Sequence, residues 1–200
     1  LIDKAEFDTI YFEHLSYFSL LPLRLLCRTT GMSIIDVEKQ AIHGGSLRVT
    51  LAPAGGPWAI SDRVSLLLES EKARGIDRLA WYAAYAEQVQ DKMAAFADQL
   101  IGLKAAGKSI AAFGASAKGN VLLNCAKIDA EIIDYIVDDT PEKIGRFSPG
   151  TGIPIVDQQT LVQQPPDVLV ILSWNFAQEI RQKLASIFRG RYVVPTEVQA

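Results

Sequence analysis

From Ser109 to the C-terminus, short apolar runs alternate with helix-like segments, and this alternation constrains the fold more than any other feature. Runs such as IAAF and VLVIL are apolar at consecutive positions, which is typical of strands buried on both faces. Strands that alternate with helices predict an α/β fold, here a doubly wound, mostly parallel Rossmann-like domain over residues 108–200. The expected strands are 109–114, 132–139, 152–156, 167–174 and 191–195, and the expected helices are 117–127, 157–163 and 175–188.

The chain before Ser109 has a different pattern. Residues 1–56 contain a predicted helix from a Ser19 cap to about Thr30 and two strand-like segments joined by a glycine-containing linker, which allows a hairpin. Residues 57–107 are predicted to be connector helices. The expected details are strands at 33–39 and 46–52, a helix at about 60–73 interrupted by Gly75, and a second helix from an Asp77 cap to about Ala106, ended by Gly107.

Composition excludes several classes of protein. The 200 residues are 49% hydrophobic and 22% charged, so the chain can bury a sizeable core. The net charge is −3 and no basic stripe is visible, so we expect no nucleic-acid partner. No run approaches the ~18 apolar residues of a membrane span, so no membrane partner is expected.

The cysteines and the N-terminus indicate where the chain works. Cys27 and Cys125 lie far apart in apolar helical patterns, as buried thiols of a reducing compartment do, and we expect a cytoplasmic protein without a metal site. The first residues lack an initiator Met and a signal peptide. We therefore expect the chain to be a piece of a longer protein.

The turn GASAKGN, residues 114–120, joins a predicted buried strand to a predicted helix. The N–H groups at such a helix start can bind an anion, and Lys118 adds a positive charge, which together favour a phosphate-bearing ligand. The turn lacks the second glycine of G-x-G-x-x-G and the lysine spacing of a P-loop, so a purely structural turn remains the alternative. The candidate binding residues here are Gly114, Ser116, Lys118, Gly119 and Asn120.

Two further motifs are expected at the same edge of the sheet, because ligands of such sheets bind at the carboxyl ends of the strands. Asp138 ends the second strand and could bind a ribose hydroxyl, or could simply terminate the strand. Trp174 and Asn175, followed by Phe176, could stack on a base or sugar, or form the hinge between strand and helix.

Tyr11, Glu13 and His14 form a separate candidate site near the N-terminus. An imidazole beside a carboxylate and a phenol can act as a general acid or base. The alternative is a polar stretch ahead of the Ser19 cap. The segment His43-Gly44-Gly45-Ser46 is likewise either a site loop or a hairpin turn.

Read together, five motifs resemble the S-adenosylmethionine-dependent C-methyltransferases of nucleotide-linked deoxysugars. They are FDTIYFEHLSYFSL, IHGGSLRV, GASAKGN, IDYIVDDTPEKIGRFSPGTGIPIV and ILSWNF, in this order along nearly the whole chain. That family has a zinc domain, a methyl-donor domain and a Rossmann-like C-terminal domain. The resemblance implies that residues 1–56 are the terminal strands of a truncated methyltransferase domain, 57–107 are connector helices, and 108–200 bind the nucleotide sugar.

The resemblance also implies a mechanism. C3 of a keto sugar lies next to a carbonyl, so a base can remove its proton and the enolate can attack the donor methyl group. His14 would be that base, Tyr11 and Glu13 would orient it or stabilise charge, and no metal is needed. The methyl-donor loop is absent from this sequence, so we expect this chain alone to be inactive.

The rival interpretation is a non-catalytic nucleotide or sugar-nucleotide binding module. The enzyme requires Tyr11, Glu13 and His14 to face a cleft shared with the GASAKGN turn, whereas the module does not.

Overall fold

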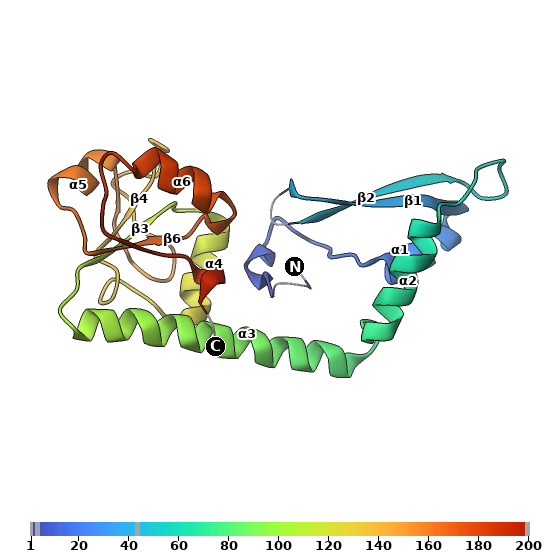
Figure 1. Ribbon diagram of the computed structural model, residues 1–200, viewed down its shortest axis with the longest axis horizontal. Coiled ribbons are helices and arrows are strands. Elements are labelled where there is room, and N and C mark those ends of the chain that lie inside the picture. Colours follow the sequence, from blue (N-terminus) through green and yellow to red (C-terminus); the bar gives the residue numbers. More distant parts are fainter. Residues whose placement is uncertain (1, 3–4, 43–44, 199–200) are drawn as a thin grey trace. The chain divides into compact units, whose positions relative to one another are not determined.

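A computed structural model describes residues 2, 5–42 and 45–198. The chain forms two compact units (Figure 1), the first comprising His14–Glu87 and the second comprising Ile2–Glu13 together with Gln88–Ala200. These bounds differ from the expected ones at 56/57 and 107/108. The connector is divided because the C-terminal half of its long helix buries Met93, Phe96 and Leu100 in the core of the second unit. Among the described residues, no helix has both the length and the apolarity that crossing a bilayer requires.

The first unit contains an antiparallel hairpin packed on two helices. Its strands pair from Met32 opposite Pro53 to Gln40 opposite Ser46, which confirms the expected hairpin. The residues 43–44 of its turn lie outside the described part of the chain, so the proposed role of His43 and Gly44 in a site loop is not addressed. The elements are α1 (Leu20–Thr29), β1 (Met32–Gln40), β2 (Ser46–Pro53) and α2 (Asp62–Arg74).

The start of α1 is capped from another helix. The side chain of Ser19, the expected cap, makes no capping hydrogen bond. Instead, the carboxylate of Glu71 in α2 accepts the N–H groups of Leu20 at 2.8 Å and Leu21 at 2.9 Å. A carboxylate with two oxygens satisfies two unpaired donors and complements the positive end of the helix dipole, so it replaces the shorter hydroxyl.

The connector helices end where glycines were expected. Ser61 caps α2 by accepting the N–H of Arg63, and Gly75 ends the helix in a left-handed conformation. Helix α3 (Leu79–Ala105) ends just before Gly107, as predicted. Asp77 lies two residues before the first residue of α3, one position earlier than a cap would.

The second unit is built on a five-stranded sheet with the order β5-β4-β3-β6-β7, and every neighbouring pair is parallel. This confirms the Rossmann-like α/β expectation. Each strand is shorter than predicted, because only part of each expected segment pairs with a neighbouring strand. The elements are β3 (Ile110–Phe113), α4 (Ala117–Ala126), β4 (Tyr135–Val137), β5 (Ile155–Val156), α5 (Gln158–Gln163), β6 (Val168–Ile171), α6 (Ala177–Leu184) and β7 (Arg191–Val193), with 3-10 turns η1 (Phe7–Thr9), η3 (Trp174–Phe176) and η4 (Pro195–Glu197).

Helices cover both faces of this sheet (Figure 1). Ile110 and Ala112 of β3 join the apolar core shared with α3 and α4. The alternate residues Ala111 and Phe113 join the core shared with α5 and α6. Because successive side chains of a strand point to opposite faces, a strand apolar at every position must be covered twice, which is what the sequence pattern predicted.

The strand order places a switch point beside β3. The chain runs from β3 outward through β4 to β5 and then returns to β6 on the other side of β3. The connections after β3 and β6 therefore leave the sheet in opposite directions, which opens a crevice at their carboxyl ends.

Candidate functional site

A hollow of about 460 Å³ lies at the carboxyl ends of the central strands of the second unit. Its position matches the sequence prediction that the ends of β3, β4 and β6 meet at one edge of the sheet. The lining residues come from the turns after these three strands and from one side of α6. They are Phe113, Gly114, Asp138, Asp139, Thr140, Ser173, Phe176, Glu179, Ile180 and Lys183.

The turns after β3 and β6 touch at Gly114. This residue has a φ of +94°, and a Cβ built on it would lie 2.4 Å from Oγ of Ser173. Its N–H donates to the carbonyl of Val137 at 2.8 Å, which also ties it to β4. Only glycine combines this conformation with so close a contact, so Gly114 shapes the floor of the hollow.

The rest of the GASAKGN turn starts α4. Oγ of Ser116 caps the helix by accepting the N–H of Gly119 at 3.1 Å. A Cβ on Gly119 would lie 2.7 Å from Cβ of Leu172, so this glycine lets α4 pack closely on the end of β6. Asn120 is half-buried, and its Oδ1 has no hydrogen-bond partner among the described residues. Two of the predicted binding residues thus have a local structural role as well.

Lys118 does not line the hollow. Its Nζ lies 4.8 Å from the centroid of the Trp174 ring. Trp174 is only 8% exposed, and its indole N–H donates to the carboxylate of Asp8. Asn175 is half-buried in the same 3-10 turn, whereas Phe176 is 49% exposed and lines the hollow. Of the two aromatic rings in this turn, that of Phe176 is the one that lines the hollow.

Asp138 joins the turns after β3 and β4. Its Oδ2 accepts the N–H of Ala115 at 2.7 Å, and its Oδ1 accepts the N–H of Thr140 at 2.9 Å. Nζ of Lys143 lies 3.3 Å from Oδ2. Burial raises the pKa of Asp138, but the hydrogen bonds from Thr140, the charge of Lys143 and the N–H of Ala115 outweigh it, so the pKa lies below its usual value. The carboxylate is therefore ionised and organises this edge of the sheet.

Sequence reasoning placed Asp139, with Asp138, at this edge of the sheet but missed the charged residues that α6 contributes. Nζ of Lys183 lies 5.4 Å from the centroid of the Phe113 ring, and Lys183 pairs with Asp139. Glu179, one helical turn before Lys183, lines the same hollow. The signal was present, because positions 179 and 183 share one face of the predicted helix.

The three predicted catalytic residues are divided between the units. Tyr11 and Glu13 follow η1 in the second unit, where Tyr11 is half-buried and Glu13 is exposed. Neither belongs to the lining of the hollow. His14 is an exposed residue of the first unit, and its ring meets that of Tyr17 edge-on with centroids 6.3 Å apart.

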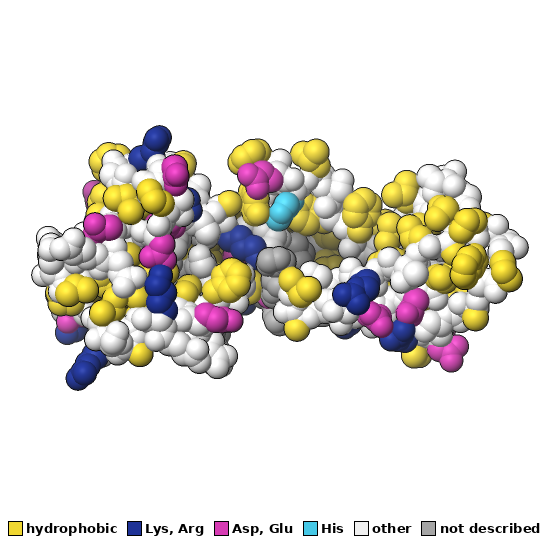
Figure 2. Space-filling model, turned by 90° about the horizontal axis from the view of Figure 1, so that it is seen from above, with side chains coloured by type: hydrophobic (Ala, Val, Ile, Leu, Met, Phe, Trp, Pro, Cys, Tyr) yellow, Lys and Arg dark blue, Asp and Glu magenta, His cyan; other side chains and the backbone are white. Residues whose placement is uncertain are grey.

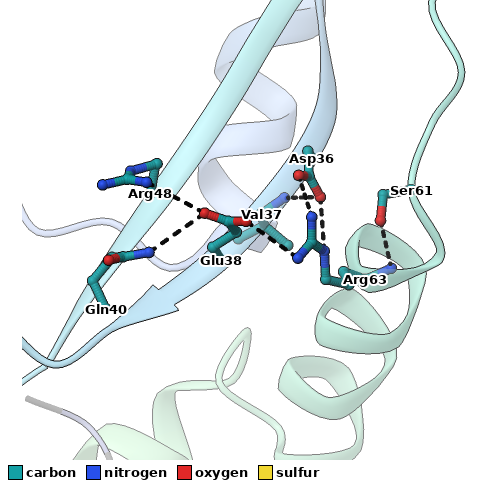
Figure 3. Close-up of polar contacts among 7 residues, drawn as sticks. All are labelled: Asp36, Val37, Glu38, Gln40, Arg48, Ser61 and Arg63. Carbon is teal, nitrogen blue, oxygen red and sulfur yellow. Dashed lines mark hydrogen bonds and ion pairs between the residues drawn. The ribbon is translucent and has the colours of Figure 1, made fainter.

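The first unit has a polar groove of its own, of about 550 Å³, between β1 and α2. There Arg63 bridges two acids of β1 (Figure 3), with Nε 3.0 Å from Oδ1 of Asp36 and Nη1 3.3 Å from Oε1 of Glu38. Arg48 of β2 approaches Glu38 from the other side at 3.5 Å. Exposed ion pairs contribute little stability each, so this network mainly orients α2 on the hairpin.

These features define the class of the second unit, which is a Rossmann-like α/β domain with a ligand-sized hollow at its switch point. Residues 41–196 match the family described as the C-methyltransferase C-terminal domain. The chain is also 34% identical over 197 residues to the C-methyltransferase NovU of Streptomyces niveus. The aligned region covers 98% of this chain and 47% of that protein. The chain therefore belongs to the C-methyltransferase family, and it spans about half the length of this curated relative.

Proposed function

We propose that the chain is the C-terminal portion of an S-adenosylmethionine-dependent C-methyltransferase acting on a nucleotide-linked keto-deoxysugar, and that its second unit supplies the nucleotide-sugar site. The observation that carries the proposal is the hollow at the carboxyl ends of β3, β4 and β6 in a chain of this family. In open parallel sheets this is the place where nucleotides bind.

The lining offers groups suited to a nucleotide. Phe176 presents an exposed ring against which a base or sugar can stack. Asp139 and Glu179 can accept hydrogen bonds from sugar hydroxyls. Lys183, which pairs with Asp139, is the basic residue of the lining that a diphosphate could contact. Lys118, which the sequence favoured for this task, faces Trp174 instead.

The chemistry assigned to the N-terminal segment rests on the family resemblance. His14 would remove the proton at C3 of the sugar, which is acidified by the neighbouring carbonyl, and Tyr11 and Glu13 would orient the imidazole or stabilise the developing charge. An imidazole suits this step because its ordinary pKa lies near neutrality.

The methyl donor does not fit the described residues of the first unit. Donor sites of the Rossmann type need a parallel strand, a glycine-rich turn and a helix, whereas β1 and β2 form an antiparallel hairpin. We therefore assign no residue of the first unit to S-adenosylmethionine. The second unit has a strand-turn-helix of this kind, from β3 to α4, and we assign it to the nucleotide sugar. When bound elsewhere, S-adenosylmethionine would supply the methyl group.

Exposed apolar side chains support the proposal that the part of residues 1–56 that lies in the first unit, residues 14–56, belongs to a larger domain. Figure 2 shows hydrophobic side chains gathered over the part of the first unit that contains the hairpin. Leu25 of α1 is 65% exposed, and Leu47 and Leu51 of β2 are exposed as well. Clusters of this kind typically face another protein surface.

The second candidate function is a nucleotide-binding module without catalysis. One observation favours it, namely that the lining of the hollow comes entirely from the second unit and includes none of Tyr11, Glu13 and His14. The two functions share the nucleotide site and differ in whether His14 is needed for turnover.

A titration of the chain with uridine diphosphate, followed by amide NMR, tests the shared site. We expect shifts at Gly114, Thr140, Ser173 and Phe176, and weaker binding in Lys183→Ala than in Lys118→Ala at low salt, because only Lys183 lines the hollow. Uridine is the control that lacks the phosphates. Shifts confined to other regions, or equal affinity in wild type and Lys183→Ala, would remove this site.

A further inference from the structure

A buried acid near the N-terminus is hydrogen-bonded to a tryptophan 166 residues further along the chain. Asp8 in η1 is 2% exposed, and its Oδ2 accepts the indole N–H of Trp174. Nζ of Lys118 lies over the Trp174 ring, 4.8 Å from its centroid. All three residues belong to the second unit, so the contact lies within one compact body.

The segment around Asp8 is folded and seated on the Rossmann-like core. Its 3-10 turn packs against α4, and Phe7 packs against the core shared with α3 and α4. The N–H of Ile10 donates to the carbonyl of Phe7 at 2.9 Å, which closes the turn immediately before Tyr11. The cavity between this segment, Leu122 and Trp174 measures only about 10 Å³, so the interface is closely packed.

Packing alone does not explain a carboxylate at this position. Burial raises the pKa of Asp8 above its usual value, although the hydrogen bond from Trp174 and the charge of Lys118 oppose the rise. Its Oδ1 has no hydrogen-bond partner among the described residues. An apolar side chain would avoid this desolvation penalty. The carboxylate instead specifies the position of η1, because the indole N–H of Trp174 finds its acceptor only when η1 packs in this one orientation.

The turn that contains Trp174, η3, also contributes to the wall of the hollow. Trp174 stands between Ser173 and Phe176 in the chain, and both of these line the hollow at the strand ends. Tyr11 and Glu13 follow Asp8 after a few residues. A single turn, η3, thus contacts the proposed nucleotide site on one side and the anchor of the N-terminal segment on the other.

We propose that Asp8 and Trp174 are positioning residues, whose hydrogen bond fixes the segment of Tyr11 and Glu13 on the Rossmann-like domain and couples it to occupancy of the hollow. The role of Tyr11 and Glu13 in catalysis rests on the proposed function. The anchoring of the segment does not, because it follows from contacts within the second unit.

Two sets of variants of the chain test the anchor by NMR. Asp8→Leu removes the acceptor and Trp174→Phe removes the donor but keeps an aromatic ring, whereas Asp8→Asn keeps an acceptor oxygen. In the first two we expect amide exchange at Ile10 to accelerate at least tenfold and the amides of residues 9–13 to gain mobility. Asp8→Asn should keep the wild-type exchange rate at Ile10 and the wild-type indole resonance of Trp174. If Asp8 only filled space, Asp8→Asn and Asp8→Leu would not be expected to differ in this way.

The outcomes separate the anchor from the proposed function. If Asp8→Leu fails to fold, Trp174→Phe carries the test. Unchanged exchange at Ile10 in the variant that folds, or an Asp8→Asn that behaves like Asp8→Leu, would overturn the anchor. With saturating uridine diphosphate, wild type should show shifts at Tyr11 and Glu13 that disappear in Trp174→Phe. Uridine diphosphate that binds the hollow without these shifts overturns the coupling, whereas no binding at all overturns the proposed function and leaves the anchor to the exchange data.

Discussion

Gly114 and Ser173 meet so closely that a Cβ on Gly114 would lie 2.4 Å from the Ser173 hydroxyl oxygen. The two residues lie in the turns that follow β3 and β6, which are neighbouring strands at the switch point. Their contact closes the bottom of the crevice, and the remaining space is the hollow that Phe176 and Lys183 line. The glycine that sequence analysis assigned to a ligand is therefore first a requirement of the crevice itself.

Gly114→Ala should destabilise the second unit. A side chain in this left-handed conformation costs roughly 1–2 kcal/mol, and the contact with Ser173 adds to that penalty. Ser173→Gly should recover the part that is due to the contact. Gly102→Ala is the matched control, because Gly102 is an exposed position of α3 where a Cβ meets nothing within 4 Å, and alanine is favoured over glycine inside a helix by about 1 kcal/mol. Urea unfolding of the four proteins measures the differences.

Glu71→Ala should destabilise the first unit by about 1–3 kcal/mol, because the N–H groups of Leu20 and Leu21 lose their acceptor. Glu71→Gln should lose less, since an amide oxygen can replace one of the two bonds. Glu69→Ala, an exposed position of the same helix, is the control. Hydrogen exchange in α1 locates the effect, and equal exchange in Glu71→Ala and wild type would contradict the cap.

Acid should destabilise the second unit through Asp138. The native pKa of Asp138 lies below the model-peptide value of 3.8, so the carboxylate contributes stability that is present above pH 3.8 and is lost as the pH falls through the native pKa. Asp138→Asn should lower stability at pH 7 and flatten its decline in acid. Thermal unfolding from pH 7 down to below the native pKa of Asp138 measures both slopes, and curves that stay parallel over this whole range would show that the ionisation of Asp138 does not contribute.

Local sequence patterns were sufficient to predict the fold of the second unit. All five strands and the helices between them were expected, because runs such as Ile110–Phe113 are apolar at every position and only a doubly covered strand explains that pattern. The helix ends at Gly75 and Gly107 were also predictable from local sequence, because a helix end depends on residues that are close together in the chain.

The contacts that shape the site were not predictable because they join distant residues. Glu71 caps a helix that begins 51 residues earlier, and Asp8 pairs with Trp174 across 166 residues. No local pattern specifies such partners. The direction of Lys118 was missed for a related reason, because the ring over which it lies belongs to the turn after another strand.

The chain alone should not bind S-adenosylmethionine appreciably. The described residues of the first unit provide an antiparallel hairpin and no glycine-rich strand-turn-helix to hold the donor. In the second unit, the strand-turn-helix from β3 to α4 is the one proposed to hold the nucleotide sugar. Isothermal titration of the chain with the donor should therefore give no measurable heat at micromolar concentrations. Micromolar affinity would show that a donor site exists in this chain and would change the proposed division of labour.

The role of His14 is testable in a methyltransferase-competent protein that contains this chain. His14→Asn removes the base but keeps a polar side chain at an exposed position, so the fold should be unaffected. General-base catalysis contributes about 10²–10⁴-fold, and kcat should fall by that order while KM for the nucleotide sugar stays close to wild type. We expect kcat to change without KM because none of the residues that line the proposed nucleotide site is near His14 in sequence.

Exchange of the sugar C3 proton in deuterated water locates the defect without relying on methyl transfer. Wild type should exchange this proton before the donor is added, and His14→Asn should not, since deprotonation precedes transfer. Loss of turnover with normal exchange would place His14 after proton removal. Normal turnover in His14→Asn would exclude it from the reaction and favour the non-catalytic nucleotide-binding module.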